Sequence, residues 1–393
     1  MLPLHTFGQS SRPLPDGPLK VLSLDEALGT RLPHGSVLVM PDEDDKVPPS
    51  AIARLGFAGI VSRGSVLTPD LPVLHSLRDP DVVAPGDAVQ VHSENGQVQV
   101  LFRRRSTSNS LFITERCNSY CLMCSQPPRE TDDDWRIDHL TRLIGLIDDS
   151  TEVLGVTGGE PTLLGGRLGQ LLQHASATLP RTNLHVLTNG RLFEDKSLVR
   201  EFSGLERRIT WGIPLYADVP DVHDYVVQSC GAFFETIEGI YNLAQAGHLI
   251  EIRFVVSKAT LPRLEAFAEF LLRNVPFAAH VALMGLEPMG FAKRNRELLW
   301  VDPTDYAERV ASVAERLDSR GMPVSIYNMP LCVLPEQVWP LAQRSISDWK
   351  QVYDSNCESC SVRSRCAGFF RSAGENWKPR ALRPIESAEA THG

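Results

Sequence analysis

Three cysteines lie within eight residues of this chain, at Cys117, Cys121 and Cys124, shortly after an apolar run that ends at Ile113. Four thiolates complete the ligand set of an iron–sulfur cluster or a structural zinc site, so this group is one ligand short. A cluster held by three thiolates keeps one iron open, and a small molecule can then bind the metal directly. A zinc ion would instead need a fourth donor, for which His139 is the nearest candidate.

The spacing of these cysteines also allows a structural role without a metal. Positions i, i+4 and i+7 share one face of a helix, and buried cysteines often pack as small hydrophobes. However, Asn118 and Ser119 lie inside the segment, and Ser-Gln-Pro-Pro follows it at residues 125–128. These residues favour a loop and end a helix. The sequence therefore predicts a loop that offers three thiols to a metal centre.

A second cysteine group lies near the end of the chain and consists of Cys332, Cys357, Cys360 and Cys366. Four cysteines make a complete ligand set, either for an auxiliary [4Fe–4S] cluster or for the zinc ion of a ribbon. The two groups contain seven of the eight cysteines of the chain, and in a reducing compartment this favours metal binding over disulfides. Cys230 stands alone, and packing is its default role.

From about residue 110 onward, strand-like and helical patterns alternate. The strand-like runs cover residues 111–113, 153–156, 184–187, 209–213, 250–256 and 280–284. The helical patterns between them cover residues 137–147, 167–177, 196–202, 233–246 and 263–273. Six strands that alternate with helices predict an α/β fold with a parallel sheet, either open and doubly wound or an incomplete barrel. In both topologies the functional residues lie at the carboxyl ends of the strands.

A glycine-rich turn follows the second of these strands and consists of Gly158, Gly159, Glu160 and Pro161. Glycine lacks a Cβ, so its backbone can approach a ligand closely, and Glu160 places a carboxylate at the end of the strand. A plain strand-to-helix turn is the alternative. The 33 residues between Cys124 and Gly158 leave room for one helix and one strand, so the two loops should lie side by side.

Further polar residues follow other strands. Thr188 and Asn189 come after the third strand and could bind the hydroxyls of a ribose, while an αL turn at Asn-Gly is the structural alternative. Arg253, on the fifth strand, could pair with a carboxylate or form an outward-facing salt bridge. His223 and Asp224, after the fourth strand, could exchange a proton with a substrate or form a surface capping pair.

The spacing C-x3-C-x2-C at a strand end, followed by Gly-Gly-Glu-Pro, resembles the motifs of the radical S-adenosylmethionine (SAM) enzymes. The resemblance implies a partial (β/α)6 barrel and a [4Fe–4S] cluster whose open iron binds the amino and carboxylate groups of SAM. It also implies cleavage of SAM to a 5'-deoxyadenosyl radical, a backbone contact from residues 158–161 to SAM, and a SAM carboxylate within reach of Arg253. Two positions depart from the family pattern: Met123 replaces an aromatic residue, and residues 213–216 lack a serine.

The C-terminal C-x2-C-x5-C pattern, with Gly368 shortly after it, resembles the SPASM/Twitch auxiliary-cluster extension. Together with residues 118–128, 327–332, 345–350 and 366–370, it makes residues 111–370 similar to the His-Xaa-Ser system radical SAM maturase HxsC. This resemblance implies a peptide or small protein substrate with His-Xaa-Ser repeats and a second radical SAM maturase as a partner. An electron donor such as flavodoxin or ferredoxin is also implied, and the auxiliary cluster would relay electrons or anchor the substrate.

Two other functions fit the same residues. One is a radical SAM enzyme that acts on a small molecule or a cofactor precursor. The other is a non-catalytic zinc or iron–sulfur protein that serves as a scaffold for a partner.

Composition and charge predict how the chain is organised and where it works. We expect an N-terminal α+β accessory domain at residues 1–105 with a hairpin at Asn95-Gly96, the partial barrel at 106–300, the auxiliary-cluster region at 301–375 and a flexible tail at 376–393. The net charge of −9 gives no sign of a nucleic-acid or anionic-membrane surface. The sequence shows no signal-peptide pattern and no apolar run near the roughly 18 residues of a membrane span. These features predict a cytoplasmic protein.

Overall fold

The computed structural model describes residues 4–41, 48–63, 70–344 and 352–386. The chain divides into two compact units. The first comprises Met1–Leu111, Asp134–Leu154 and Gln170–Asn183. The second comprises Phe112–Asp133, Gly155–Gly169 and Leu184–Gly393. The segment at residues 345–350, which contributes to the resemblance above, lies outside the described residues.

An eight-stranded sheet forms the centre of the first unit, in the order β1-β8-β7-β3-β4-β5-β6-β2. Its strands are β1 (His5–Phe7), β2 (Gln9–Ser10), β3 (Leu19–Leu22), β4 (Val37–Val39), β5 (Gly59–Val61), β6 (Val73–His75), β7 (Ala88–His92) and β8 (Gln97–Phe102). The predicted hairpin is confirmed, because β7 and β8 pair antiparallel on either side of a turn that contains Asn95 and Gly96. The helices α1 (Leu24–Gly29) and α2 (Pro49–Arg54) belong to the same region.

The two faces of this sheet bury separate apolar cores. Residues alternate along a strand, so Val21 and Leu38 pack into one core while Leu22 and Val39 pack into the other. Helix α1 adds Leu24 to the second core. Strands β3 and β4 are therefore apolar at nearly every position, as is typical of strands covered on both faces.

The second sheet has seven strands, in the order β15-β14-β13-β12-β11-β10-β9. These strands are β9 (Asn109–Phe112), β10 (Val153–Thr157), β11 (Asn183–Leu187), β12 (Ile209–Pro214), β13 (Leu249–Val255), β14 (His280–Met284) and β15 (Val324–Tyr327). The five strands from β11 to β15 pair in parallel. Strands β9 and β15 form the two edges of this sheet, so the barrel is incomplete.

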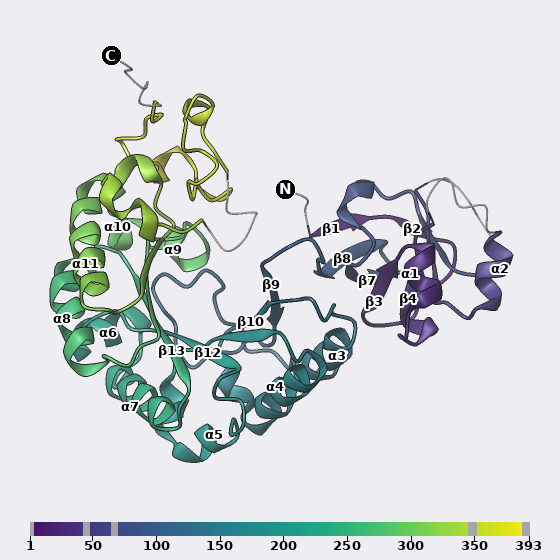
Figure 1. Ribbon diagram of the computed structural model, residues 1–393, viewed down its shortest axis with the longest axis horizontal. Helices are drawn as coiled ribbons and strands as arrows, with labels where there is room; N and C mark the ends of the chain where they lie inside the picture. Colours follow the sequence, from purple (N-terminus) through teal and green to yellow (C-terminus); the bar gives the residue numbers. More distant parts are fainter. Residues whose placement is uncertain (1–3, 42–47, 64–69, 345–351, 387–393) are drawn as a thin grey trace. The chain divides into compact units, whose positions relative to one another are not determined.

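Helices connect the strands of this sheet, as predicted. They are α3 (Trp135–Ile144), α4 (Gly166–Thr178), α5 (Lys196–Arg200), α6 (Pro220–Val227), α7 (Ala232–Gln245), α8 (Leu264–Asn274), α9 (Gly290–Arg294), α10 (Arg296–Leu299) and α11 (Ala307–Ser319). Figure 1 shows α7, α8 and α11 along the outer side of the strands, and α7 contacts β13 while α11 contacts β15. The prediction of six strands is corrected, because α11 leads to the seventh strand, β15, beyond the expected boundary at residue 300.

Side chains alternate between the two faces of the barrel strands. On β12, Trp211 is fully buried and packs edge to face against Phe193 and Phe202, with ring centroids 4.8 and 5.0 Å away. Its neighbour Gly212 lines a cavity inside the barrel instead. The outer face therefore holds the helices through apolar contacts, and the inner face is free to carry polar groups.

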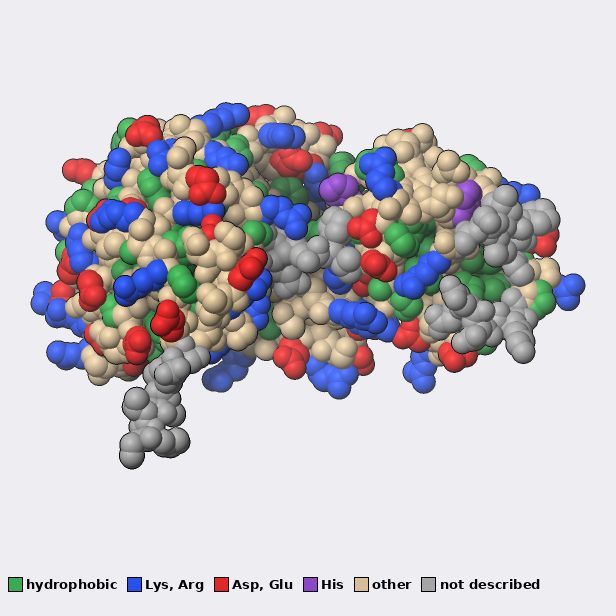
Figure 2. Space-filling model, turned by 90° about the horizontal axis from the view of Figure 1, so that it is seen from above, with side chains coloured by type: hydrophobic (Ala, Val, Ile, Leu, Met, Phe, Trp, Pro, Cys, Tyr) green, Lys and Arg blue, Asp and Glu red, His purple; other side chains and the backbone are tan. Residues whose placement is uncertain are grey.

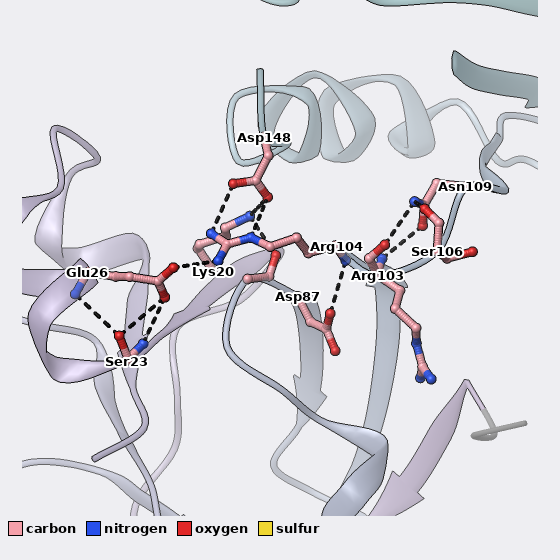
Figure 3. A network of polar contacts seen from close by, with 10 residues as sticks. Lys20, Ser23, Glu26, Asp87, Arg103, Arg104, Ser106, Asn109 and Asp148 are labelled. Carbon is pink, nitrogen blue, oxygen red and sulfur yellow. Dashed lines mark hydrogen bonds and ion pairs between the residues drawn. The ribbon is translucent and has the colours of Figure 1, made fainter. Parts of the chain in front are cut away.

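A buried ion-pair network ties the N-terminal sheet to the segment that follows α3, within the first unit (Figure 3). The ammonium of Lys20, whose side chain is 3% exposed, lies 2.7 Å from the carboxylate of Asp148. Arg104 donates to both carboxylate oxygens of Asp148, at 3.2 and 3.0 Å, and also pairs with Glu26. Burial would raise the pKa of Asp148, but the hydrogen bonds from Arg104 and Lys20 lower it. Asp148 therefore stays charged at neutral pH and balances two cations.

Charged side chains of both signs are interspersed on the face drawn in Figure 2, where blue and red side chains alternate. Among the described residues, no helix is long and apolar enough to cross a membrane.

Replacement of Asp148 by asparagine should destabilise the protein, because Lys20 would stay buried without its counter-charge. Removal of one partner of a buried ion pair costs about 3 to 5 kcal/mol. We expect a loss near the lower end of that range, since the side chain of Asp148 is 22% exposed. Urea unfolding followed by circular dichroism measures the change in the free energy of unfolding.

The matched control is Asp149→Asn. The Asp149 side chain is 76% exposed and lies 3.0 Å from Arg181, and such surface pairs contribute less than about 1 kcal/mol. Equal losses in the two variants would contradict the structural role given to Asp148.

Candidate functional site

Two neighbouring loops leave the sheet after β9 and β10 (Figure 1). The N–H of Gly159 donates to the carbonyl oxygen of Thr114 at 2.7 Å. The N–H of Glu160 donates in the same way to Arg116, also at 2.7 Å. A Cβ on Gly158 would lie 2.6 Å from the Thr114 oxygen, and one on Gly159 would lie 2.1 Å from the Arg116 oxygen. The two glycines are therefore required because the backbone of the cysteine loop packs directly on them.

This contact confirms that the two loops lie side by side. The sequence predicts close approach of a ligand at the glycines, whereas the close neighbour in the structure is protein backbone. The SAM contacts of residues 158–161 stay a prediction.

A cavity of about 260 Å³ opens where these loops meet. All three thiols of the cysteine loop line it, together with Gly158 and Gly159. In the part of the chain that the structure describes, no three His, Cys, Asp or Glu side chains lie close enough together to hold one metal ion.

The thiols of the cysteine loop are protonated at neutral pH in the metal-free chain. Burial raises the pKa of Cys117 to about 12, and burial also raises the pKa of Cys124. The pKa of Cys121 is raised by burial and, to a smaller extent, by the neighbouring Cys124 and Cys117. Metal centres bind the thiolate, so assembly of a metal centre here would release protons.

Glu160 connects the ends of β10 and β11 from a fully buried position. Its Oε1 accepts hydrogen bonds from the hydroxyl of Thr188 at 2.6 Å and from the backbone N–H of Thr162 at 2.9 Å. Its Oε2 accepts from the N–H of Asn189 at 2.6 Å. The predicted site residues Glu160, Thr188 and Asn189 are thus brought together, and they bind one another across the strand ends.

The cysteine loop is held by residues that follow β11. Asn189 donates its side-chain N–H to Oδ1 of Asn118 at 2.6 Å. The guanidinium of Arg191 donates to the carbonyl oxygen of Asn118 at 2.6 Å and to the hydroxyl of Ser119 at 3.0 Å, and it pairs with Glu235 at 2.5 Å. Arg191 is absent from the sequence-based candidates, because no local pattern links it to a loop more than 70 residues earlier.

The other end of the cysteine loop is held from the opposite side of the barrel. The N–H of Phe291 donates to the carbonyl oxygen of Cys124 at 2.8 Å, and the side-chain amide of Asn295 donates to that of Leu122 at 2.8 Å. Gly290 has φ +51°, and a Cβ there would lie 2.3 Å from the Cys124 oxygen. The positions of all three thiols are therefore set by backbone contacts on both sides.

Arg253 lies inside the barrel and lines the cavity. Its Nη1 donates to Oε1 of Glu251 at 2.5 Å, and its Nη2 donates to the sulfur of Met284 at 3.4 Å. Its side chain is 16% exposed. Arg253 therefore does not form the outward-facing salt bridge that was the alternative, because its ion pair with Glu251 lies inside the barrel. Its pairing with a SAM carboxylate stays a prediction.

His223 and Asp224 have structural contacts. His223 is 1% exposed, and its Nδ1 accepts the backbone N–H of Tyr216, a residue of the cavity lining, at 3.2 Å. Asp224 accepts the N–H groups of Gly231 and Phe233 at 2.6 and 2.8 Å and so caps α7. The capping role predicted for Asp224 is confirmed, but His223 is buried rather than on the surface.

Three other candidates lie apart from the described lining of the cavity. Pro161 begins a short 3-10 helix, Pro161–Leu164, as its fixed φ favours. His139, the candidate fourth zinc ligand, belongs to the first unit and packs edge to face against Trp135. Cys230 is exposed, so the packing role expected for it is corrected.

The four C-terminal cysteines, Cys332, Cys357, Cys360 and Cys366, line a second and smaller cavity of about 10 Å³. The backbone N–H groups of Leu331 and Gly368 each donate to the Cys366 sulfur at 3.4 Å. The N–H of Ile385 donates to the Cys360 sulfur at 3.5 Å. Hydrogen bonds of this kind stabilise thiolates and adjust the potential of iron–sulfur clusters.

Residues 376–386, expected to be part of a flexible tail, make specific contacts instead. The indole of Trp377 is 9% exposed, Lys378 pairs with Asp354, and the carbonyl oxygen of Ile385 accepts the N–H of Ser361 at 2.9 Å. This segment therefore covers the second cysteine group.

No model of a known protein family matches this chain, and no curated protein matches it either. Solved structures with a similar fold include SuiB from Streptococcus suis, at 18% sequence identity and a TM-score of 0.47 over 65% of this chain and 56% of SuiB. Native anSMEcpe with bound AdoMet and the Cp18Cys peptide is 16% identical, with a TM-score of 0.48 over 70% of this chain and 91% of that chain. A radical SAM methyltransferase from Sphaerobacter thermophilus is 14% identical, with a TM-score of 0.42 over 73% of this chain and 77% of that chain.

This chain therefore spans little more than half the length of SuiB. Two radical SAM methyltransferases are among the solved structures that match it.

Because His223 is buried, the free energy of unfolding should depend on pH in a predictable way. Burial lowers the pKa of His223 from 6.5 to about 4. The unfolded chain therefore binds this proton more readily than the folded one, so the stabilisation is complete above about pH 6.5 and is lost as the pH falls toward 4. The full shift corresponds to about 3 kcal/mol. Unfolding free energies measured across this pH range for the wild type and His223→Asn isolate the contribution of the ring.

Asparagine at position 223 can still accept the Tyr216 N–H through its Oδ1 but does not titrate. We expect its stability to fall less than that of the wild type between pH 6.5 and 4. Parallel curves for the two proteins would contradict a buried neutral histidine.

Proposed function

We propose that this chain is a radical SAM enzyme in which Cys117, Cys121 and Cys124 hold a [4Fe–4S] cluster and the adjoining cavity binds SAM. One observation carries the proposal: these thiols and the turn at Gly158 and Gly159 line one cavity at the carboxyl ends of the strands of an incomplete α/β barrel. When bound, the cluster would supply the electron that cleaves SAM to a 5'-deoxyadenosyl radical.

The arrangement of the thiols fits a cluster better than a zinc ion. Zn–S bonds are about 2.3 Å long, so the ligands of a zinc ion converge on one point. In a [4Fe–4S] cluster each thiolate binds a different iron, so the thiols surround a larger space. The three cysteines line one cavity of about 260 Å³.

The chain's own residues would bind and orient SAM. The backbone of Gly158 and Gly159 lines the cavity next to the thiols, where its carbonyl oxygens can accept hydrogen bonds from the amino group of SAM. Arg253 supplies a cation on the cavity wall that suits the SAM carboxylate. Thr188 and Asn189 line the same cavity and are proposed to face the ribose hydroxyls. Glu160 and Pro161 fix the turn. Their proposed contact with SAM is made by the backbone of the turn, not by their side chains.

An auxiliary [4Fe–4S] cluster is proposed at Cys332, Cys357, Cys360 and Cys366. Two features support it: the four sulfurs line one cavity, and backbone N–H groups donate to two of them. The cluster would relay an electron from the substrate or hold the substrate directly.

The proposed substrate is a peptide or small protein with His-Xaa-Ser repeats, as the resemblance to the HxsC maturase suggests. The terminal strands β9 and β15 do not pair with each other, which leaves one side of the barrel open, and an open side suits a macromolecular substrate. A second radical SAM maturase and an electron donor such as flavodoxin or ferredoxin are the proposed partners, and the cytoplasm is the proposed location.

Two alternatives can be separated from this proposal by direct measurement. For a radical SAM enzyme of small molecules, mass spectrometry would find no mass change in His-Xaa-Ser repeat peptides incubated with the reconstituted protein. For a zinc scaffold, the purified protein would be colourless, whereas an iron–sulfur protein is brown with broad visible absorbance.

Simultaneous replacement of Cys117, Cys121 and Cys124 by alanine should abolish reductive cleavage of SAM, because no other residue holds the proposed cluster. Chromatographic quantitation of 5'-deoxyadenosine after reduction with dithionite measures it. The matched control is Cys230→Ala, since Cys230 is exposed and belongs to neither cysteine group. Persistent 5'-deoxyadenosine in the triple variant would reject the assignment.

Replacement of Cys332, Cys357, Cys360 and Cys366 by alanine should remove half of the iron and sulfide from the anaerobically reconstituted protein. The cluster of the cysteine loop should stay, because its three thiols lie around a separate cavity. Iron and sulfide quantitation, with zinc measured in parallel, tests this. Unchanged iron together with loss of zinc would favour a zinc ribbon.

A further inference from the structure

A row of polar side chains crosses the interior of the barrel next to Arg253. Its members are His185 on β11, Glu251 on β13, His280 on β14 and Ser325 on β15. Nε2 of His185 lies 3.3 Å from Oε1 of Glu251. Nδ1 of His280 lies 2.9 Å from Oε2 of Glu251, and its Nε2 lies 3.0 Å from the hydroxyl of Ser325. The row therefore links strands that are far apart in the sequence.

Glu251 is the centre of this row. Its side chain is 10% exposed, and both carboxylate oxygens have partners. Burial would raise its pKa, but the hydrogen bonds from His185 and His280 and the charge of Arg253 hold it well below the usual range. Glu251 is therefore ionised at every pH at which the protein would work, and a buried carboxylate of this kind needs its partners in place.

The fit around Glu251 depends on a glycine. Gly212 pairs with Glu251 in the parallel register of β12 and β13. A Cβ at Gly212 would lie 3.1 Å from Nε2 of His185 and 3.2 Å from Cδ of Arg253. The absence of a side chain at this position thus leaves the space in which the histidine and the arginine approach the carboxylate.

Two contacts hold the guanidinium of Arg253. Its Nη1 is held by Glu251 and its Nη2 contacts the sulfur of Met284, while the residue lines the cavity that the three cysteines share. A guanidinium has five N–H donors in a fixed plane, so donors stay available for a ligand after these two contacts. An ion pair with Glu251 therefore fixes the direction of the guanidinium without using all of its donors.

We propose that Glu251, held between His185 and His280, is a positioning residue that keeps Arg253 oriented to bind the carboxylate of SAM. The proposal rests on the proposed function of the cavity. An arginine that is free to rotate points toward the ligand for only a fraction of the time, and the observed affinity for the ligand is reduced by that fraction. The row of side chains fixes the direction of the guanidinium before the ligand binds, so this reduction in affinity is avoided.

The test compares two ligands on the anaerobically reconstituted full chain. SAM carries the carboxylate, and decarboxylated SAM lacks it. Isothermal titration gives the dissociation constants of both, and their ratio reports the contribution of the carboxylate. In Glu251→Gln, which keeps the shape but loses the charge, we expect SAM to bind about tenfold more weakly while decarboxylated SAM is unaffected.

A pair of variants at position 280 separates positioning from simple packing. His280→Asn can keep a donor near the place of Nδ1 and should retain most of the preference for SAM. His280→Ala loses that donor and should behave like Glu251→Gln. The control is His248→Ala, a buried histidine outside the row that packs against Trp211, which should lower the melting temperature without changing the ratio.

The possible outcomes are distinct. If the wild type does not bind SAM, the proposed function is contradicted and this inference falls with it. If the wild type and Arg253→Ala differ in their preference for SAM but Glu251→Gln matches the wild type, the function stands and the positioning role is overturned. Equal weakening of both ligands in Glu251→Gln would assign Glu251 a structural role only and would also overturn the proposal.

Discussion

The site depends on one backbone contact, between the turn after β10 and the first residues of the cysteine loop. Two peptide N–H groups, of Gly159 and Glu160, donate to the carbonyl oxygens of Thr114 and Arg116. The two backbone segments lie too close together for a side chain to fit between them. Because peptide groups are rigid and the contact is direct, the start of the cysteine loop has a fixed position relative to the turn after β10. The remaining contacts of the loop build on that starting point.

Buried polar groups then fix the direction of the loop. A fully buried carboxylate destabilises a protein unless its oxygens accept hydrogen bonds. The oxygens of Glu160 accept them from Thr162, Thr188 and Asn189. The segment after β11 is thereby held against β10, and from there Arg191 binds the cysteine loop. The motif residue Glu160 thus acts through its neighbours, since it places the residues that hold the thiols.

Local patterns in the sequence predict much of this fold and less of the site. Alternation of apolar residues indicates six strands and the helices between them, and the prolines and polar residues around the cysteines indicate a loop. The seventh strand, Val324–Tyr327, is not among the predicted runs, and its pairing with β14 decides its structure. The roles of Arg191 and Glu251 depend on partners brought together only by the sheet, so no spacing along the chain could indicate them. The three cysteines of the loop could be found because they lie within eight residues of one another.

Met123 joins the cysteine loop to an apolar cluster. It is buried and packs in one apolar cluster with Tyr216, Leu286 and Trp377. Trp377 belongs to the segment that covers the second cysteine group, so that segment also supports the cysteine loop through this cluster. A methionine side chain is flexible and fills irregular space, whereas an aromatic ring in its place would need a flat slot. Tyr216 and Trp377 contribute aromatic side chains to the same cluster, so the C-terminal segment and the cysteine loop share one apolar core.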